Sequence, residues 1–386
     1  MIDKRICDFL KYLYLSSSED VFEYNENLDF KLFIPVAKKN RLTNIMFYGI
    51  KNIKKEYQPS QELTTKLYHE CMMYGVKTFH QDKAFKNIAD AYEKENIQLT
   101  VVKGQILKNL YLKPDMRVMG DIDFIVPRKD YVRARKILVE QFGYVIEHED
   151  KDELCALNDK KVCVELHQHL ATELSNNQKY FDHTYENHII AKDNYFELDI
   201  NYHFLYMMDH IYKHFVDGGL GLKYILDFAL FIKRYPNVIN ETIEELKKLK
   251  LANLTLGFLQ ICNDYIGIDC SSQLSLFEKR VNEEATEKLI KLMLKNGEYG
   301  TVESRVNAKN VQGTFFKRMI RRLFPMVIRP GKNRIIEIII YPFRLIWYWI
   351  TFVFGNFKYI KHVFSKKSSM DEKEKNEIQI MFDELK

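Results

Sequence analysis

Residues 120–126 read GDIDFIV, a short β-branched and aromatic run that carries two aspartates. Side chains two residues apart on a strand point to the same face. Asp121 and Asp123 would therefore project together from the start of this strand, with Ile122 and Phe124 on the opposite face. Two neighbouring carboxylates repel each other unless a cation lies between them, and Mg²⁺ prefers such hard oxygen ligands. The run predicts a strand with a divalent-metal site at its start.

A third acid follows in the run VCVELH at 162–167, where Glu165 ends a mostly apolar stretch. This stretch is expected to form a strand of the same small sheet. Three carboxylates can hold two cations about 3.5–4 Å apart, which aligns an attacking oxygen with a leaving pyrophosphate. Asp121, Asp123 and Glu165 are therefore the predicted catalytic and metal-ligating residues. Since an Asp-x-Asp pair by itself is more often a solvated turn, the prediction depends on the combination.

Residues before the aspartates supply positive charge for a phosphate. Lys103 and Gly104 follow the run IQLTVV at 97–102, where a strand is expected to turn into a helix. Gly104 lets the backbone approach a ligand closely, and a helix start aims free N–H groups at an anion. With Arg117 and Gly120, these two residues form the predicted nucleotide-binding set.

The elements around these residues follow the order β-α-β-α-β-β-β. The expected elements are a strand over 97–102, a helix over 105–112, a strand over Asp121–Val126, a helix over Asp130–Phe142, a strand over Tyr144–Glu147 and a hairpin made by ELCALN and KVCVELH. Helical spacing marks 1–95, with one amphipathic helix over Gln81–Glu95, and it returns between Asp199 and Leu294. The expected fold class is α+β, a small mixed sheet with flanking helices embedded between helical N- and C-terminal regions.

Composition supports a folded chain, because 46% of the residues are hydrophobic and 13% are aromatic. Six cysteines without a C-x-x-C pair argue against a zinc site and a disulfide framework. No secretory signal is visible, so a cytoplasmic setting is expected. The predicted regions are an N-terminal helical region (1–95), a catalytic core (96–175), a helical acceptor-side domain (176–310) and a basic, aromatic-rich helical tail (311–386).

The tail suggests a membrane surface as a partner. Residues 317–367 hold twelve Lys and Arg against one acid, Glu337. Ile335–Phe357 is long enough to suggest a transmembrane helix, but Glu337 and Arg344 would be costly there and Pro342 would break the helix. Both tryptophans lie in this apolar run and several cations flank it, which suits a helix lying on an anionic surface at the inner face of the membrane. Packing of the tail on the catalytic core is an equally weighted alternative.

Three histidines after the core have a weaker claim. His203, His210 and His214 share one helical face, and the last two have the spacing of helix-borne metal ligands. Ile211 stands where an H-E-x-x-H motif needs Glu, so core or interface histidines are the favoured interpretation. If they are functional, His210, Lys213 and His214 line the acceptor side of the cleft.

Two further residues have structural as well as functional interpretations. His167 either orients a carboxylate or packs beside the sheet, and it is included on the acceptor side. Asp227 is a lone acid in an apolar helical run, for which a histidine or lysine of the preceding helix is the expected partner.

The stretch VVKGQILKNLYLKPDMRVMGDIDFIV at 101–126, followed by VCVELHQHL at 162–170, resembles the uncharacterised bacterial nucleotidyltransferase family of the DNA polymerase β superfamily. The superfamily pattern corresponds to Gly104, Asp121, Asp123 and Glu165, and the family's own additions correspond to Lys103, Arg117 and His167. Lys103 stands where the wider superfamily has a second glycine. The resemblance implies a polymerase β-like nucleotidyltransferase core, two Mg²⁺ ions (or Mn²⁺) and an NTP donor, with ATP binding among the expectations.

These observations favour metal-dependent transfer of a nucleoside monophosphate from an NTP to an unknown acceptor hydroxyl. One alternative is toxin-like nucleotidylation of a protein or RNA; the basic tail could attract nucleic acid, but no RNA-binding motif supports that partner. The other alternative is a non-catalytic, nucleotide-binding or membrane-associated scaffold on the same fold.

Overall fold

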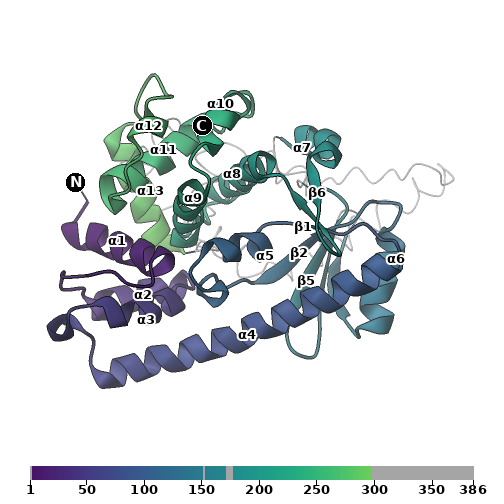
Figure 1. The fold of residues 1–386 in the computed structure, drawn as a ribbon, viewed down its shortest axis with the longest axis horizontal. Coiled ribbons are helices and arrows are strands. Elements are labelled where there is room, and N and C mark those ends of the chain that lie inside the picture. The colour runs from purple at the N-terminus through teal and green to yellow at the C-terminus, as the bar shows by residue number, and fades with distance from the viewer. Residues whose placement is uncertain (1, 151–152, 171–176, 298–386) are drawn as a thin grey trace, which may run out of the picture.

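The structure, a computed structural model, describes residues 2–150, 153–170 and 177–297 of the 386-residue chain. Figure 1 shows a helical half, which contains the N-terminus and the end of the described chain, beside a half built on one sheet. The predicted tail 311–386, its basic segment 317–367 and the end of region 176–310 lie outside the described residues.

The N-terminal region is helical, as its spacing predicted. Its helices are α1 (Lys4–Ser18), α2 (Phe30–Lys39), α3 (Thr43–Gly49) and α4 (Gln61–Lys94). Asp3 caps α1 by accepting a hydrogen bond from the backbone N–H of Arg5, and Ser60 caps α4 through that of Leu63. The predicted helix Gln81–Glu95 is the C-terminal part of α4, whose 34 residues run beneath both halves of the molecule (Figure 1).

The strands are β1 (Thr100–Val101), β2 (Asp121–Ile125), β3 (Val145–Glu149), β4 (Glu153–Leu157), β5 (Cys163–His167), β6 (Ile189–Ala191) and β7 (Phe196–Leu198). They form one seven-stranded mixed sheet in the order β3-β4-β5-β2-β1-β7-β6. β2 pairs in parallel with β5 and antiparallel with β1, while β3, β4 and β5 are antiparallel to one another in turn. The predicted α+β class and the predicted order of elements in the core are confirmed.

Several elements differ in length from the prediction. The first strand is reduced to β1, and the helix after it is α5 (Gly104–Leu107), continued by a 3-10 turn at Lys108–Leu110. The helix expected over Asp130–Phe142 is α6 (Tyr131–Lys136) followed by a π-helical turn at Ile137–Gln141. The hairpin β6–β7 was not predicted; it lies in a region expected to be helical and extends the sheet beyond β1.

The remaining helices are α7 (Gln178–Thr184), α8 (Ile200–Val216), α9 (Leu222–Arg234), α10 (Val238–Lys248), α11 (Ala252–Ile261), α12 (Ser271–Leu274) and α13 (Glu283–Asn296). Further 3-10 turns lie at Ile50–Asn52, Lys55–Tyr57, Pro114–Met116 and Tyr185–His188, and a second π-helical turn lies at Cys262–Ile266.

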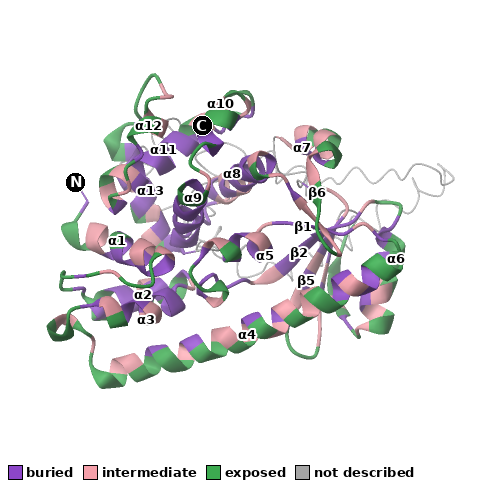
Figure 2. Cartoon of the chain, viewed as in Figure 1, coloured by how far each residue is buried: buried purple, intermediate pink, exposed green. Residues whose placement is uncertain are grey.

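The apolar side chains form two cores. Helices α1–α3 pack with α8–α11 and α13 in one core that includes the fully buried Phe9, Phe204 and Phe228. The second core lies between the sheet and the C-terminal part of α4, where Tyr92 and Phe124 are fully buried. Figure 2 shows the buried residues on the inward faces of the helices and an exposed outer face along α4. The segments on either side of the sheet region thus fold together.

None of the helices in the described part of the chain is long and apolar enough to span a membrane.

Candidate active site

The local pattern of β2 places the two aspartates at one edge of the cavity described below. Ile122 and Phe124 are fully buried in the sheet core, so the alternating strand directs Asp121 and Asp123 to the other face. In the parallel pairing of β2 with β5, Asp123 lies directly opposite Glu165. Neighbouring strands are about 4.8 Å apart, which brings the two carboxylates within contact distance of a shared ligand.

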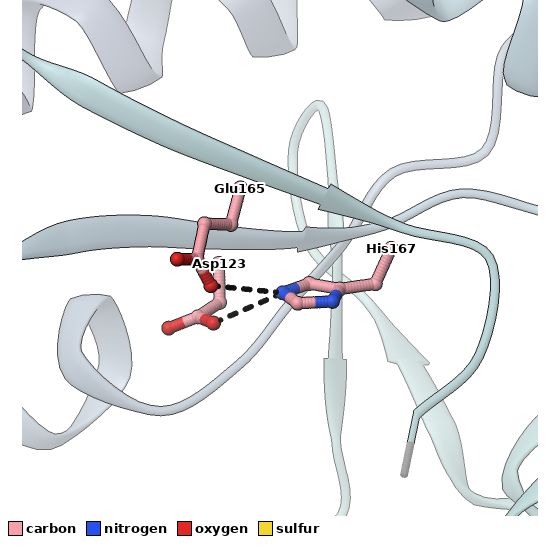
Figure 3. A group of neighbouring side chains, drawn as sticks. All are labelled: Asp123, Glu165 and His167. Atoms are coloured by element: carbon pink, nitrogen blue, oxygen red, sulfur yellow. Dashed lines mark hydrogen bonds and ion pairs between the residues drawn. The ribbon is translucent and has the colours of Figure 1, made fainter. Parts of the chain in front are cut away.

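Asp123, Glu165 and His167 form a compact group in which one ligand atom of each lies within 4.8 Å of the others. His167 Nε2 is 3.2 Å from Asp123 Oδ1 and 3.4 Å from Glu165 Oε2 (Figure 3). Its other ring nitrogen, Nδ1, is 3.1 Å from Glu153 Oε2 on β4. One imidazole therefore holds three carboxylates in place, which fits the interpretation that His167 orients a carboxylate.

The charges of the group depend on one another. Burial alone would lower the pKa of His167, but hydrogen bonds to Asp123, Glu153 and Glu165 outweigh it and raise the pKa to about 10. Burial opposes ionisation of Asp123, but the charges of Lys103 and His167 hold the pKa of that carboxyl well below its usual range. Asp123 is therefore an anion with two cationic neighbours.

Asp121 has a different environment on the same strand. It lines the cavity beside Asp123 without belonging to the three-residue group. Burial, followed by the charges of Asp123 and Glu165, raises the pKa of Asp121 to about 7. The repulsion expected from the sequence is thus present, and a divalent cation would relieve it.

Lys103 and Gly104 lie where β1 leads into α5, but their contacts are within the protein. Lys103 Nζ is 2.5 Å from Asp123 Oδ1, and the backbone of Lys103 has a positive φ of 54°. A Cβ on Gly104 would lie 2.8 Å from both Arg117 Nη1 and Met119 Sδ. Gly104 therefore allows two side chains to pack against the start of α5.

Arg117 is held by a buried acid. Its Nε is 2.7 Å from Asp227 Oδ1 and its Nη2 is 2.8 Å from Asp227 Oδ2, while the Tyr111 hydroxyl donates to Asp227 Oδ1 at 2.8 Å. Arg117 and Asp227 are 6% and 1% exposed. The expected partner of Asp227, a histidine or lysine of the preceding helix, was therefore wrong; the nearest cation comes from the loop before β2.

A cavity of about 240 Å³ joins these groups. Lys103, Gly104, Arg117, Gly120, Asp121, Asp123 and Glu165 line it on the side of the sheet, and His203, Tyr206, His210, Lys213, His214, Lys223, Tyr224 and Asp227 are among the residues that line it from α8 and α9. All of the predicted site residues except His167 thus line one cavity, and His167 contacts two that do. One wall is rich in carboxylates, and the other carries lysines and histidines.

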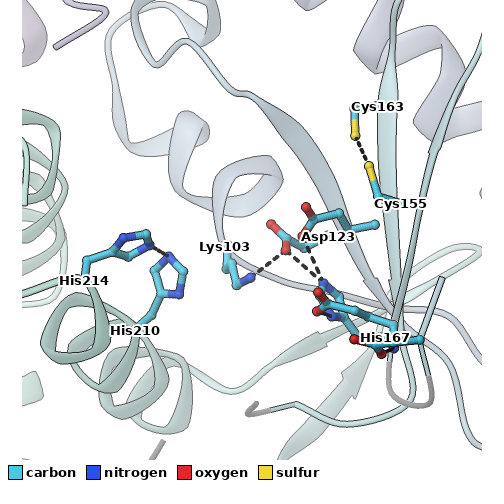
Figure 4. Close-up of polar contacts among 10 residues, drawn as sticks. Lys103, Asp123, Cys155, Cys163, His167, His210 and His214 are labelled. Carbon is cyan, nitrogen blue, oxygen red and sulfur yellow. Dashed lines mark hydrogen bonds and ion pairs between the residues drawn. The ribbon is translucent and has the colours of Figure 1, made fainter. Parts of the chain in front are cut away.

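The three histidines of α8 have different surroundings. His210 and His214 lie with their Nε2 atoms 3.1 Å apart, and Figure 4 shows this pair facing Lys103 and Asp123. Burial, then the charge of His214, lowers the pKa of His210 well below its ordinary value. Burial lowers the pKa of His203 to about 4, and its Nε2 has no hydrogen-bond partner in the described part of the chain.

Sequence reasoning missed two residues around the cavity and one pair beside it. Glu153, which contacts His167, and Lys223, which lines the cavity, were not singled out because neither belongs to a spaced motif. The thiols of Cys155 and Cys163 lie 3.1 Å apart on β4 and β5 (Figure 4), outside the cavity lining. Their positions, 155 and 163, flank the predicted hairpin turn, which was the available signal.

The donor atoms suit a hard divalent cation. Asp123 and Glu165 offer carboxylate oxygens, Asp121 adds a third close by, and His167 offers a nitrogen. Mg²⁺ and Mn²⁺ accept oxygen ligands of this kind. The arrangement can therefore hold a metal ion beside a cavity with a cationic opposite wall.

The sequence model of a family described as "Uncharacterised nucleotidyltransferase" matches residues 26–267, more than half of the chain. The match covers α2 to α11 and includes the whole sheet and both walls of the cavity. No curated protein and no solved structure matches the chain.

Proposed function

The chain belongs to this uncharacterised nucleotidyltransferase family, and on that premise we propose that it transfers a nucleoside monophosphate from an NTP to an acceptor hydroxyl. The observation that carries the proposal is the single cavity in which the three acids of β2 and β5 face the cationic side chains of α8 and α9. A metal–triphosphate complex has the complementary charges, since its cations suit the acids and its phosphates suit the lysines.

Asp121 and Asp123 are the proposed ligands of two Mg²⁺ ions, and Glu165 completes one of the two sites. When bound, these ions would offset the negative charge that develops on the triphosphate during transfer. His167 contacts both Asp123 and Glu165, so its proposed role is to hold the two carboxylates in register. Mn²⁺ would suit the same oxygen donors.

The proposed reaction forms a bond between the acceptor oxygen and the α-phosphorus while the bond from that phosphorus to pyrophosphate breaks. Glu165 receives the proton of the acceptor hydroxyl, and pyrophosphate leaves. Lys103, Gly104 and Gly120 line the same cavity, and their proposed role is to contact the donor nucleotide. Because Arg117 is paired with Asp227, its proposed contribution is to fix the wall against which Gly104 packs.

The test is thermal stabilisation of the full chain by each of the four NTPs with Mg²⁺ or Mn²⁺, followed by an assay for pyrophosphate release. We expect a metal-dependent rise in melting temperature that is lost in Asp121→Asn and Asp123→Asn. Asp159→Asn, in the exposed turn between β4 and β5, is the matched control and should respond as the wild type does.

Two results would count against the proposal. No stabilisation of the wild type by any NTP with either metal would remove the donor site. Metal-dependent binding without pyrophosphate release, for any acceptor tried, would favour the non-catalytic nucleotide-binding alternative.

A further inference from the structure

The cationic side chains that line the cavity differ in how far acids of the protein pair with them. Lys103 is paired with Asp123 at 2.5 Å, and Arg117 makes two hydrogen bonds to Asp227. These two cations are the ones that the sequence assigned to the triphosphate. Each has its charge balanced by a buried acid of the protein, so neither leaves a full positive charge for a ligand.

Lys213 is the contrasting case. It lies on α8 and lines the cavity, and its ammonium group makes no hydrogen bond or ion pair with any residue that the structure describes. Burial, then the charge of Lys103, lowers its pKa. A cation that is partly removed from water without a partner is unfavourable, and an anionic ligand would relieve that cost.

The neighbours of Lys213 suit the same kind of ligand. Lys223 on α9 is 5% exposed and lines the cavity, and so do His210 and His214. The 3.1 Å contact between the histidine Nε2 atoms requires one ring to donate a proton to the other. The accepting ring, when neutral, then carries its own proton on Nδ1 and remains a hydrogen-bond donor.

We propose that Lys213, supported by Lys223 and the His210–His214 pair, binds the β- and γ-phosphates of the donor, the pyrophosphate that leaves. This inference rests on the proposed function and names the part of the donor that α8 recognises. It moves His210, Lys213 and His214 from the acceptor side, where the sequence placed them, to the donor side. The acids of β2 and β5 lie in the same cavity of about 240 Å³, so one triphosphate with its cations can reach both walls.

The experiment is calorimetric binding of inorganic pyrophosphate to the full chain with Mg²⁺, and of each NTP against its own monophosphate. Replacing a charged donor to phosphate commonly weakens binding by about 10- to 100-fold. We expect Lys213→Gln to weaken pyrophosphate and NTP binding by that factor and to leave monophosphate binding unchanged. Lys213→Arg should restore most of the affinity, and Lys86→Gln, an exposed lysine of α4, should have no effect.

A loss of fold is distinguished from this result, because removal of a half-buried ammonium group without an ion-pair partner should leave the melting temperature of the ligand-free protein unchanged or higher. Equal affinity of wild type and Lys213→Gln for pyrophosphate would overturn the inference. Equal weakening of monophosphate and NTP binding would also overturn it, since the contact would then lie at the α-phosphate. If Lys213→Gln changes the affinity for none of pyrophosphate, the NTP and its monophosphate, the inference is wrong and the result favours a phosphate group on the acceptor as the ligand of Lys213.

The two proposals fail separately. If NTP binding depends on Asp123 but pyrophosphate binding does not depend on Lys213, the proposed function stands and the inference falls. If pyrophosphate binds through Lys213 while no NTP binds, the phosphate site stands and the proposed function falls.

Discussion

Lys103 combines an unusual backbone with a central contact. Its φ of 54° and ψ of −124° lie in a region that glycine enters freely and other residues avoid, at a cost of about 1–3 kcal/mol. Its ammonium is 2.5 Å from Asp123. The resemblance to the wider superfamily placed a glycine at this position, and the backbone explains that preference. In this chain a charged side chain is kept beside the acids at the expense of backbone strain.

We therefore predict that Lys103→Gly is more stable than Lys103→Ala by about 1 kcal/mol. Both variants lose the ion pair with Asp123, but only glycine relieves the backbone. The measurement is urea unfolding of the two variants side by side. Lys108, whose φ is −60°, is the control position, because there the alanine variant should be the more stable one. If the alanine variant is the more stable one at both positions, the backbone of Lys103 is not strained.

A second prediction concerns His203 and pH. Its pKa is lowered to about 4 in the folded protein from 6.5, so the unfolded chain binds a proton that the folded chain does not as the pH falls below 6.5. Stability should therefore fall between pH 6.5 and pH 4, by about 2–3 kcal/mol from this group at pH 4.5. His203→Phe, beside Phe231 in the same core, should lose less stability than the wild type over this range. The measurement is urea unfolding of both proteins at pH 7 and pH 4.5. An equal loss of unfolding free energy in the wild type and in His203→Phe would contradict the assignment.

For single residues, the sequence predicted the face on which a side chain lies better than it predicted the partner that the side chain contacts. Asp123 and Glu165 could be expected to meet because a strand pattern fixes which side chains share a face. The pairing of Arg117 with Asp227 could not, because 110 residues separate them and no periodicity relates a loop to a distant helix. The sequence alone does not decide between the two interpretations of His167, because its contact with Glu153 depends on the register of β4 and β5.

The long helix α4 is the element that links the two cores. Leu67 near its start belongs to the helical core, whereas Ile88 and Tyr92 near its end belong to the core beneath the sheet. Gly75 lies between these contacts, inside the helix, where glycine is the weakest common helix former apart from proline. A Cβ there would meet only Asp115 Oδ2, at 3.8 Å.

Gly75→Ala should therefore raise the free energy of unfolding by about 0.5–1 kcal/mol. Gly49→Ala is the opposite case on α3, because its Cβ would lie 2.6 Å from the Tyr12 hydroxyl oxygen in the core. The second substitution should destabilise the protein. Chemical denaturation of both variants tests the pair, and a destabilising Gly75→Ala would mean that the middle of α4 is not a continuous helix.

Helices and strands could be predicted where a regular apolar pattern extended over enough residues. The order of strands and helices from β1 to β5 followed from apolar alternation and from Gly and Pro boundaries. The hairpin β6–β7 has strands of only three residues each, which is too short for a period of two to be distinguished from a helical segment. Its turn residues Asp193 and Asn194 were the available signal.

At the scale of the whole molecule, the cavity lies where the two cores meet. Its acidic wall is formed by strands β2 and β5, which pack into the sheet core through Ile122 and Val164. Its cationic wall is formed largely by α8, which packs into the helical core through Phe204. A ligand bound to both walls would therefore stabilise the contacts between the two halves. The free energy of binding would then stabilise both cores against opening.

This arrangement predicts the pattern of amide hydrogen exchange on binding. With Mg²⁺ and the NTP that gives the largest thermal shift, exchange should slow in Asp121–Ile125 and in Ile200–Val216 together. At a free ligand concentration about 100 times the Kd, the slowing approaches 100-fold for amides that exchange by separation of the two walls. Ser271–Leu274, which does not line the cavity, should not change, and Asp123→Asn should show no slowing anywhere. Protection of the strands alone would mean that the nucleotide does not reach α8, because a ligand that contacts one wall leaves the opening of the other unaffected.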